Sequence, residues 1–222
     1  MLLTSAIRVE MNSLGLYARG FRVYEVSQVT GLSQAYLEQA ATRLIHYFNS
    51  LTNSPQMMVS HGSGTPFELF HDYELIHLAD VKVLFAANSM IQACSLLLVV
   101  ILVSAGFSQG RRADTLVGLQ HGAAATLVLL AVSAMAFVVD FSRMFTVFHL
   151  VAFDNPFWLL DPLTDYLVML FPYGFWQDMF LIAGASTGLA AGVLYVLTTR
   201  FIRASRRLCT NKPRLTTTNR DV

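Results

Sequence analysis

Three long uncharged stretches restrict most strongly how this chain can fold. They cover residues 83–107, 115–139 and 179–199, and none of them contains an Asp, Glu, Lys or Arg. A helix that crosses the hydrocarbon core of a bilayer needs about 20 mostly apolar residues. Only helices and closed barrels satisfy all their backbone polar groups in lipid. The sequence therefore predicts an all-α polytopic membrane protein with three spans and a small α or α+β domain outside the bilayer.

The overall composition agrees with a membrane protein and excludes two other classes. Charged residues make up 13% of the 222 residues and the mean hydropathy is +0.52, whereas soluble domains carry about 25% charged residues. The net charge of +1 offers no basic surface for nucleic acid, so no nucleic-acid partner is expected. With only two Cys, the chain is not a disulfide-stapled secreted scaffold.

The distribution of charge between the stretches predicts the orientation in the membrane. Basic residues outnumber acidic ones in the loop 108–114 and in the tail 200–222, whereas acidic residues dominate in 1–82 and 140–178. Because cytoplasmic segments carry the excess of Lys and Arg, we expect the loop and the basic tail in the cytoplasm. Residues 1–82 then form an extracytoplasmic domain, and residues 140–178 form an interfacial segment on the same side.

The first residues of the chain give a further expectation. Residues 1–7, MLLTSAI, are too short for the apolar region of a signal peptide with its flanks. They resemble the last turns of a membrane span. Since an outward domain of this size needs a segment that takes it across the bilayer, we expect a fourth, N-terminal span ahead of residue 1.

Several local signals predict elements in the outward segments. Ser33 is a candidate N-cap for a helix over residues 34–48, which has an apolar stripe at helical spacing. Residues 57–60 and 67–70 can form a hairpin around a Gly-containing turn. Asp72 is the expected N-cap of a helix that continues without a breaker into the first span.

Two histidines are the candidate catalytic residues. His77 lies six residues before the first span, about 9 Å along a helix, and His149 lies beyond the second span on the same predicted side. Both have carboxylates nearby: Glu74 and Asp80 near the first, and Asp154 near the second. Imidazole has a pKa near neutrality, which suits general acid–base catalysis.

Further polar and aromatic residues near the lipid boundary are candidates for binding the substrate or for orienting an imidazole. They are Glu74, Asp80, Lys82, Asn155, Trp158, Asp161 and Asp165. The pair Asp161-Pro162 predicts a helix start with Asp161 as N-cap, which would bring Asp161 and Asp165 to one helix face. For Lys82 the alternative is that its ammonium group only reaches the membrane surface.

Other kinds of site were weighed against general acid–base catalysis. The Glu74-x-x-His77 spacing is that of carboxylate-bridged di-iron helices, but the sequence has no HExxH motif, and no metal ligands are assigned. It has no Ser-x-x-Lys sequence that would supply a Ser nucleophile. Two alternatives remain open: a non-enzymatic membrane protein that binds a lipid or lipopeptide, and a metal-dependent membrane hydrolase.

Five stretches together carry a family resemblance. Residues 74–82 (ELIHLADVK), 148–149 (FH), 155–165 (NPFWLLDPLTD), 171–172 (FP) and 176–178 (WQD) resemble the bacterial lipoprotein intramolecular transacylase family. The combination is far more specific than either histidine alone.

Upstream segments extend the likeness. Residues 24–26, 30–33 and 47–50 resemble the extracellular domain of the same family, and the similarity covers nearly the whole chain to about residue 200. Members of the family have a first spanning helix before this domain.

The resemblance implies a specific acyl transfer. The family moves the acyl chain at the sn-2 position of a diacylglyceryl-modified N-terminal Cys onto the α-amino group of that Cys, which gives a lyso-form lipoprotein. It implies that His77 and His149 are the functional histidines and that no cofactor is needed. The expected partners are diacylglyceryl-modified lipoproteins and membrane lipid, and the expected location is the bacterial cytoplasmic membrane with the active site on its extracytoplasmic side.

Overall fold

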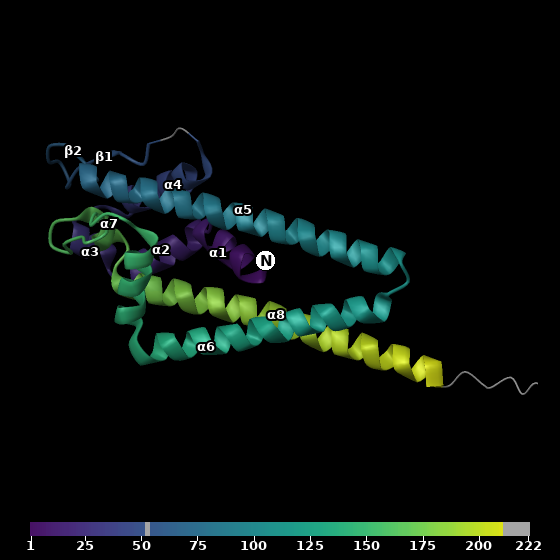
Figure 1. The fold of residues 1–222 in the computed structure, drawn as a ribbon. Coiled ribbons are helices and arrows are strands. Elements are labelled where there is room, and N and C mark those ends of the chain that lie inside the picture. Colours follow the sequence, from purple (N-terminus) through teal and green to yellow (C-terminus); the bar gives the residue numbers. More distant parts are fainter. Residues whose placement is uncertain (52–53, 211–222) are drawn as a thin grey trace, which may run out of the picture.

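Three long helices and a small lobe at one end make up the computed structural model, which describes residues 1–51 and 54–210 (Figure 1). The helices are α5 (Asp72–Ser108), α6 (Arg112–Ala152) and α8 (Tyr173–Thr210). Each contains one of the uncharged stretches, and within the described residues these three are long and apolar enough to cross a membrane. The predicted all-α membrane fold with three spans is confirmed. The tail beyond residue 210 lies outside the described residues.

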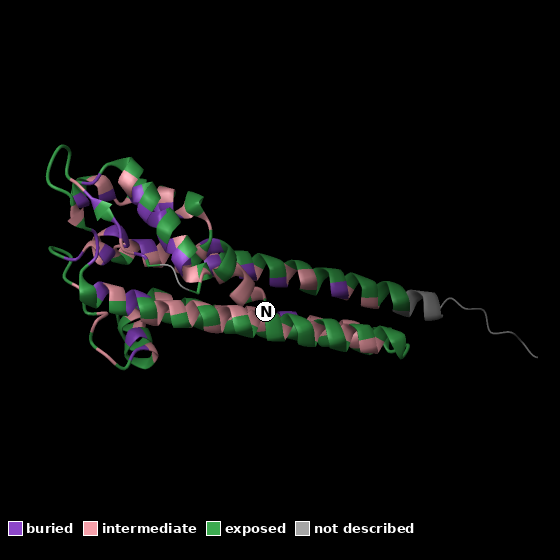
Figure 2. Ribbon diagram, turned by 90° about the horizontal axis from the view of Figure 1, so that it is seen from above, coloured by how far each residue is buried: buried purple, intermediate pink, exposed green. Residues whose placement is uncertain are grey.

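The burial pattern fits a protein surrounded by lipid. Figure 2 shows mostly exposed residues along the long helices and a concentration of buried residues in the lobe. Large apolar side chains are exposed on all three helices, for example Leu97 on α5, Val139 on α6 and Leu189 on α8. Because apolar patches of this extent are rare on soluble monomers, these faces are suited to contact with acyl chains of the bilayer.

The lobe is built from the segment that precedes α5 and the segment that connects α6 to α8. It contains α2 (Leu14–Val23), α3 (Val26–Thr30), α4 (Gln34–Asn49) and α7 (Tyr166–Leu170), with two short strands, β1 (Met58–Val59) and β2 (Phe67–Glu68). The core combines side chains from these elements and from the start of α8. Its members include Tyr17, Phe21, Leu37, Leu44, Leu170 and Phe175.

Two of the predicted local elements are confirmed. The Ser33 hydroxyl accepts the Tyr36 N–H at 3.4 Å and caps α4 as expected. The strands pair antiparallel with Met58 opposite Glu68, which is the predicted hairpin.

Two predicted helix starts are wrong. The N-cap of α5 is His71 rather than Asp72, because the Glu74 carboxylate accepts the His71 N–H at 2.7 Å and fixes the first turn one residue earlier. Residues 162–164 form a turn and not a helix, since the Asp161 carboxylate accepts the Leu163 N–H at 2.9 Å. The helix begins at Tyr166 with Asp165 as its N-cap.

A kink at Asp140 divides α6 into two parts. The backbone of this residue is non-helical (φ −163°, ψ 88°), and its carboxylate accepts the Arg143 N–H at 2.9 Å, which caps the second part. After the kink the chain turns toward the lobe (Figure 1). The kink therefore carries His149 back toward the start of α5.

Helix α1 (Leu2–Met11) lies between α5 and α8 (Figure 1). The Asn88 side chain donates to the Thr4 carbonyl at 3.1 Å, and the Gln92 side chain donates to the Ser5 hydroxyl at 2.9 Å. Residues 1–7 therefore lie beside the first uncharged stretch. The span expected ahead of residue 1 stays a prediction.

Candidate active site

His77 of α5 and His149 of α6 face each other at the lobe end of the long helices. Their ring centroids are 6.2 Å apart and the ring planes differ by 29°. Both residues are buried, with 7% and 8% of their surface exposed. The kink at Asp140 makes this approach possible, because it directs the last turns of α6 toward α5.

Aromatic rings enclose the two imidazoles. Phe153 lies 4.9 Å from the ring of His77 and 5.5 Å from that of His149, measured between centroids. Phe145 and Trp158 lie 4.2 Å and 5.1 Å from the ring of His149. The histidines are thus shielded from water on several sides.

Burial lowers the pKa of both histidines, which lie outside the uncharged stretches. For His77 the nearby His149 adds to the effect of burial and Asp80 opposes it. For His149 the hydrogen bond to the Phe145 backbone opposes the effect of burial. Since the ordinary pKa of a histidine is about 6.5, both imidazoles are neutral at pH 7 and can accept a proton.

The hydrogen bonds of the two rings differ. Nδ1 of His149 lies 2.7 Å from the Phe145 carbonyl oxygen, which can only accept, so Nδ1 carries the hydrogen and Nε2 carries a lone pair. Nδ1 of His77 is buried and has no hydrogen-bond partner. Because buried polar atoms nearly always have partners, this atom is available to a bound ligand.

A cavity of about 610 Å³ extends from the two histidines. Its wall is mostly apolar and comes from α1, α5, α6, α8 and the lobe, with a few polar groups at Asn88, Ser142, Thr146 and Tyr173. An apolar cavity of this size with a few convergent polar groups is typical of a small-molecule or lipid site.

Three of the predicted orienting residues lie at or beside this cavity. Trp158 lines it directly. Asn155 donates to the Asp80 carboxylate at 2.8 Å, which ties the loop after α6 to the turn of α5 that follows His77. Asp80 lies close enough to His77 for its charge to oppose the lowering of the His77 pKa by burial.

Two other predicted residues hold the lobe together away from the histidines. Glu74 is fully buried, and its carboxylate accepts the N–H groups of His71 and Leu167, both at 2.7 Å. Asp165 accepts the Tyr73 hydroxyl at 2.6 Å, and this bond raises the pKa of Tyr73 to about 12. These carboxylates fasten α7 to the start of α5 and do not line the cavity.

The last two predicted residues also lie apart from the histidines. The Asp161 carboxylate stabilises its own turn through Leu163. The Lys82 ammonium lies 4.1 Å from the centroid of the Tyr47 ring, a cation–π contact. Neither residue lines the cavity.

The sequence reasoning missed Phe145 and Phe153 as parts of the site. Phe145 precedes His149 by one helical turn, a spacing that places both on one face of a helix. That spacing was a usable signal for Phe145. Phe153 ends the helix and carries no comparable pattern.

The described residues supply no ligand set for a metal ion. In residues 1–51 and 54–210, no group of three or more His, Cys, Asp and Glu side chains is arranged so that it could hold a metal ion. The Glu74 oxygens, which the di-iron spacing would use, instead accept backbone N–H groups.

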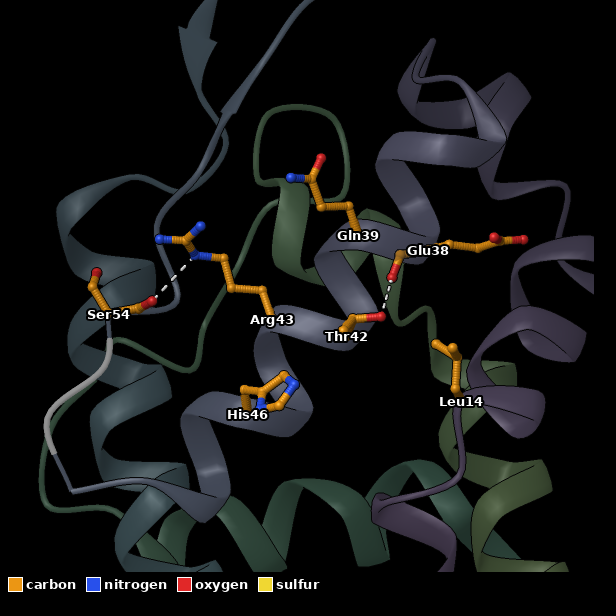
Figure 3. A pocket seen from close by; sticks show the side chains of 7 residues that line it. All are labelled: Leu14, Glu38, Gln39, Thr42, Arg43, His46 and Ser54. Atoms are coloured by element: carbon orange, nitrogen blue, oxygen red, sulfur yellow. Dashed lines mark hydrogen bonds between the residues drawn. The ribbon is translucent and has the colours of Figure 1, made fainter.

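A second depression of about 820 Å³ lies on the exposed surface of α4 (Figure 3). Its polar groups largely bond within the chain: Arg43 donates to the Ser54 carbonyl at 3.3 Å and Thr42 to the Glu38 carbonyl at 2.8 Å. It contains no buried titratable group, so the histidine cavity is the better candidate site.

Comparison with solved structures identifies the fold. The membrane-integral lipoprotein intramolecular transacylase Lit from Bacillus cereus superimposes with a TM-score of 0.77 at 16% identity, over 93% of this chain and 91% of that one. Two further structures of that protein, with a histidine replaced by Arg or by Ala, give TM-scores of 0.72 at 15% identity. They cover 94% and 93% of this chain and 88% and 89% of theirs. Curated proteins give no significant match.

The match to a protein family covers most of the chain. The family described as lipoprotein intramolecular transacylase Lit matches residues 1–176. The chain belongs to the Lit family. This Lit protein is accordingly a membrane acyltransferase, and the family resemblance seen in the sequence is confirmed.

Proposed function

We propose that this Lit protein moves the sn-2 acyl chain of a diacylglyceryl-modified Cys onto the α-amino group of the same Cys, with His77 and His149 as the catalytic residues. The product is a lyso-form lipoprotein. The observation that carries the proposal is the pair of buried, facing imidazoles, 6.2 Å apart, in an apolar cavity beside the spanning stretches.

The proposed active site lies at the outer membrane–water interface of the bacterial cytoplasmic membrane. His77 precedes the first uncharged stretch by six residues, and His149 follows the second by ten. The excess of basic residues in the loop 108–114 and the tail supports a cytoplasmic position for the opposite end. The ester bond of a membrane-anchored diacylglyceryl group lies at the same boundary.

His149 is the proposed general base. The α-amino group has a pKa near about 8, so it attacks as the free amine, and its nitrogen must lose one of its two remaining protons as the bond to the ester carbon forms. Nε2 of His149 carries the lone pair that can accept this proton, because Nδ1 donates to Phe145. The amine nitrogen forms a bond to the ester carbonyl carbon, the bond from that carbon to the sn-2 oxygen breaks, and the imidazolium returns the proton to this oxygen.

His77 is the proposed stabiliser of the oxyanion. An N–H of this neutral ring can donate a hydrogen bond to the carbonyl oxygen as negative charge develops there. Since amine and ester belong to one molecule, the enzyme mainly has to hold them in attack geometry, which can contribute several kcal/mol. Trp158 and the Asn155–Asp80 hydrogen bond hold the loop that encloses the reacting groups.

Mass spectrometry of lipoprotein N-termini tests this function. Cells that carry only His77→Ala or His149→Ala should lose the lyso-form, while the protein stays in the membrane. His46→Ala, an exposed histidine on α4, is the matched control and should leave the product unchanged. Full activity in both site variants would overturn the assignment.

The same assay separates the alternatives. Unchanged acyl placement in cells with and without the gene would favour a binding or scaffold protein. Loss of activity with a chelator would favour a metal-dependent hydrolase.

A further inference from the structure

The cavity continues from the histidines along one face of α5 into the first uncharged stretch. Its lining residues there are His77, Val81, Leu84, Phe85 and Asn88, which recur at three- and four-residue intervals. Eleven residues separate the first from the last, which is about 16 Å at 1.5 Å per residue. The cavity is thus deep as well as apolar, and its far end lies at membrane depth.

Helix α1 forms the far end of this path. It lies beside α5, held by the bonds from Asn88 to the Thr4 carbonyl and from Gln92 to the Ser5 hydroxyl. Ile7 and Met11 of α1 line the cavity. Because Ile7 is one turn from Thr4, which Asn88 contacts, Ile7 and Asn88 mark the deep end from opposite sides.

The chemistry of the path fits a straight acyl chain. Carbon–carbon bonds of about 1.5 Å at near-tetrahedral angles advance about 1.25 Å per carbon. A path of about 16 Å therefore holds roughly 13 carbons in extended form. Between His77 and Asn88, the side chains that α5 contributes to the path are aliphatic or aromatic.

We infer that the transferred acyl chain lies in this path with its methyl end against Ile7 and Asn88, so that α1 determines which chain lengths the enzyme transfers. The inference rests on the proposed transacylase function. It assigns a specificity role to α1, which lies far along the sequence from both histidines. Each methylene that does not fit should lower transfer by about fourfold, since burial of one methylene favours binding by that factor.

A competition between chain lengths tests the inference. The purified full chain in detergent receives an equimolar mixture of diacylglyceryl lipopeptides with dodecanoyl, myristoyl, palmitoyl or stearoyl at the sn-2 position. Mass spectrometry then gives the ratio of N-acyl lengths in the product. This ratio is independent of the total amount of active enzyme, so a variant that folds partly still gives a valid answer.

Substitutions at the deep end should shift the ratio in opposite directions. Ile7→Phe shortens the path and should raise the ratio of dodecanoyl to stearoyl product by about tenfold relative to the unmodified protein. Ile7→Ala should lower this ratio. Asn88→Ala removes volume from the opposite side and should act like Ile7→Ala. Val9→Phe and Val9→Ala, at a position that is 70% exposed on the same helix, are the controls and should leave the ratio unchanged.

Two negative results point to different errors. If the Ile7 and Asn88 variants make product with an unchanged ratio of acyl lengths, the methyl end of the acyl chain does not lie against α1 and the inference is wrong. If the unmodified enzyme makes no lyso-form from any of the four substrates, the proposed function is wrong instead.

Discussion

Replacement of Glu74 tests how the loop beside the histidines is held to α5. This carboxylate is fully buried and accepts two backbone N–H groups, one from His71 and one from Leu167. A hydrogen bond to a charged group contributes about 1.5–3 kcal/mol. The Leu167 bond is buried and the His71 bond only partly so, and removal of the carboxylate also relieves its desolvation cost. The expected net loss for Glu74→Ala is about 4 kcal/mol.

Thermal unfolding in detergent measures this loss. For a chain of this size about 1 kcal/mol corresponds to 2–4 °C in Tm, so Glu74→Ala should lower Tm by roughly 8–16 °C. Glu74→Gln keeps one acceptor oxygen and should lose about half as much. Glu38→Ala, an exposed acid on α4, should change Tm by no more than about 2 °C. A Tm for Glu74→Ala within about 2 °C of the unmodified chain would refute this account.

Three further predictions concern the site itself. Because burial lowers the pKa of His77 and His149, both imidazoles should titrate below about 6.5 when they are followed by NMR of labelled histidine in the purified protein. Titration of either ring at or above that value would contradict this account of their burial. Asn155→Ala removes the hydrogen bond to Asp80 and should lower kcat about tenfold with little change in Tm. Initial rates measure kcat and thermal unfolding measures Tm. An unchanged kcat would show that this bond does not matter to catalysis. Phe153→Ala should admit water beside His77, raise its pKa, and move its NMR titration toward higher pH. An unmoved titration would show that the Phe153 ring does not set this pKa.

Elements of the lobe could be predicted from the sequence where the residues that cap or turn the chain lie close together in sequence. Ser33 caps α4 through an N–H three residues away, and the hairpin forms around a short turn with Gly at a positive φ. The start of α5 was predicted one residue too late because the Glu74 carboxylate caps the helix through the His71 N–H. The start of α7 was predicted wrongly because its N-cap residue bonds to a distant side chain. Asp165 is oriented by the Tyr73 hydroxyl, 92 residues away in sequence.

For the candidate site as well, some features could be predicted from the sequence and others could not. Both histidines could be selected from the sequence by residue type and by their position next to uncharged stretches. The roles of their neighbours could not, because Glu74, Asp161 and Lys82 were equally plausible as orienting groups until their actual partners were known. Distances across α5, α6 and the loop decide which carboxylate can affect an imidazole.

The sequence by itself determined that this protein resides in a membrane and that residues 83–107, 115–139 and 179–199 are suited to cross it. Hydrophobicity over about 20 residues is a property of each segment alone, so no tertiary information is needed for it. Only the tertiary structure decided that two histidines 72 positions apart meet in one cavity, because the non-helical backbone at Asp140 redirects the end of α6. It also decided that α1 lines the deep end of that cavity, since packing between segments distant in sequence depends on all of them together.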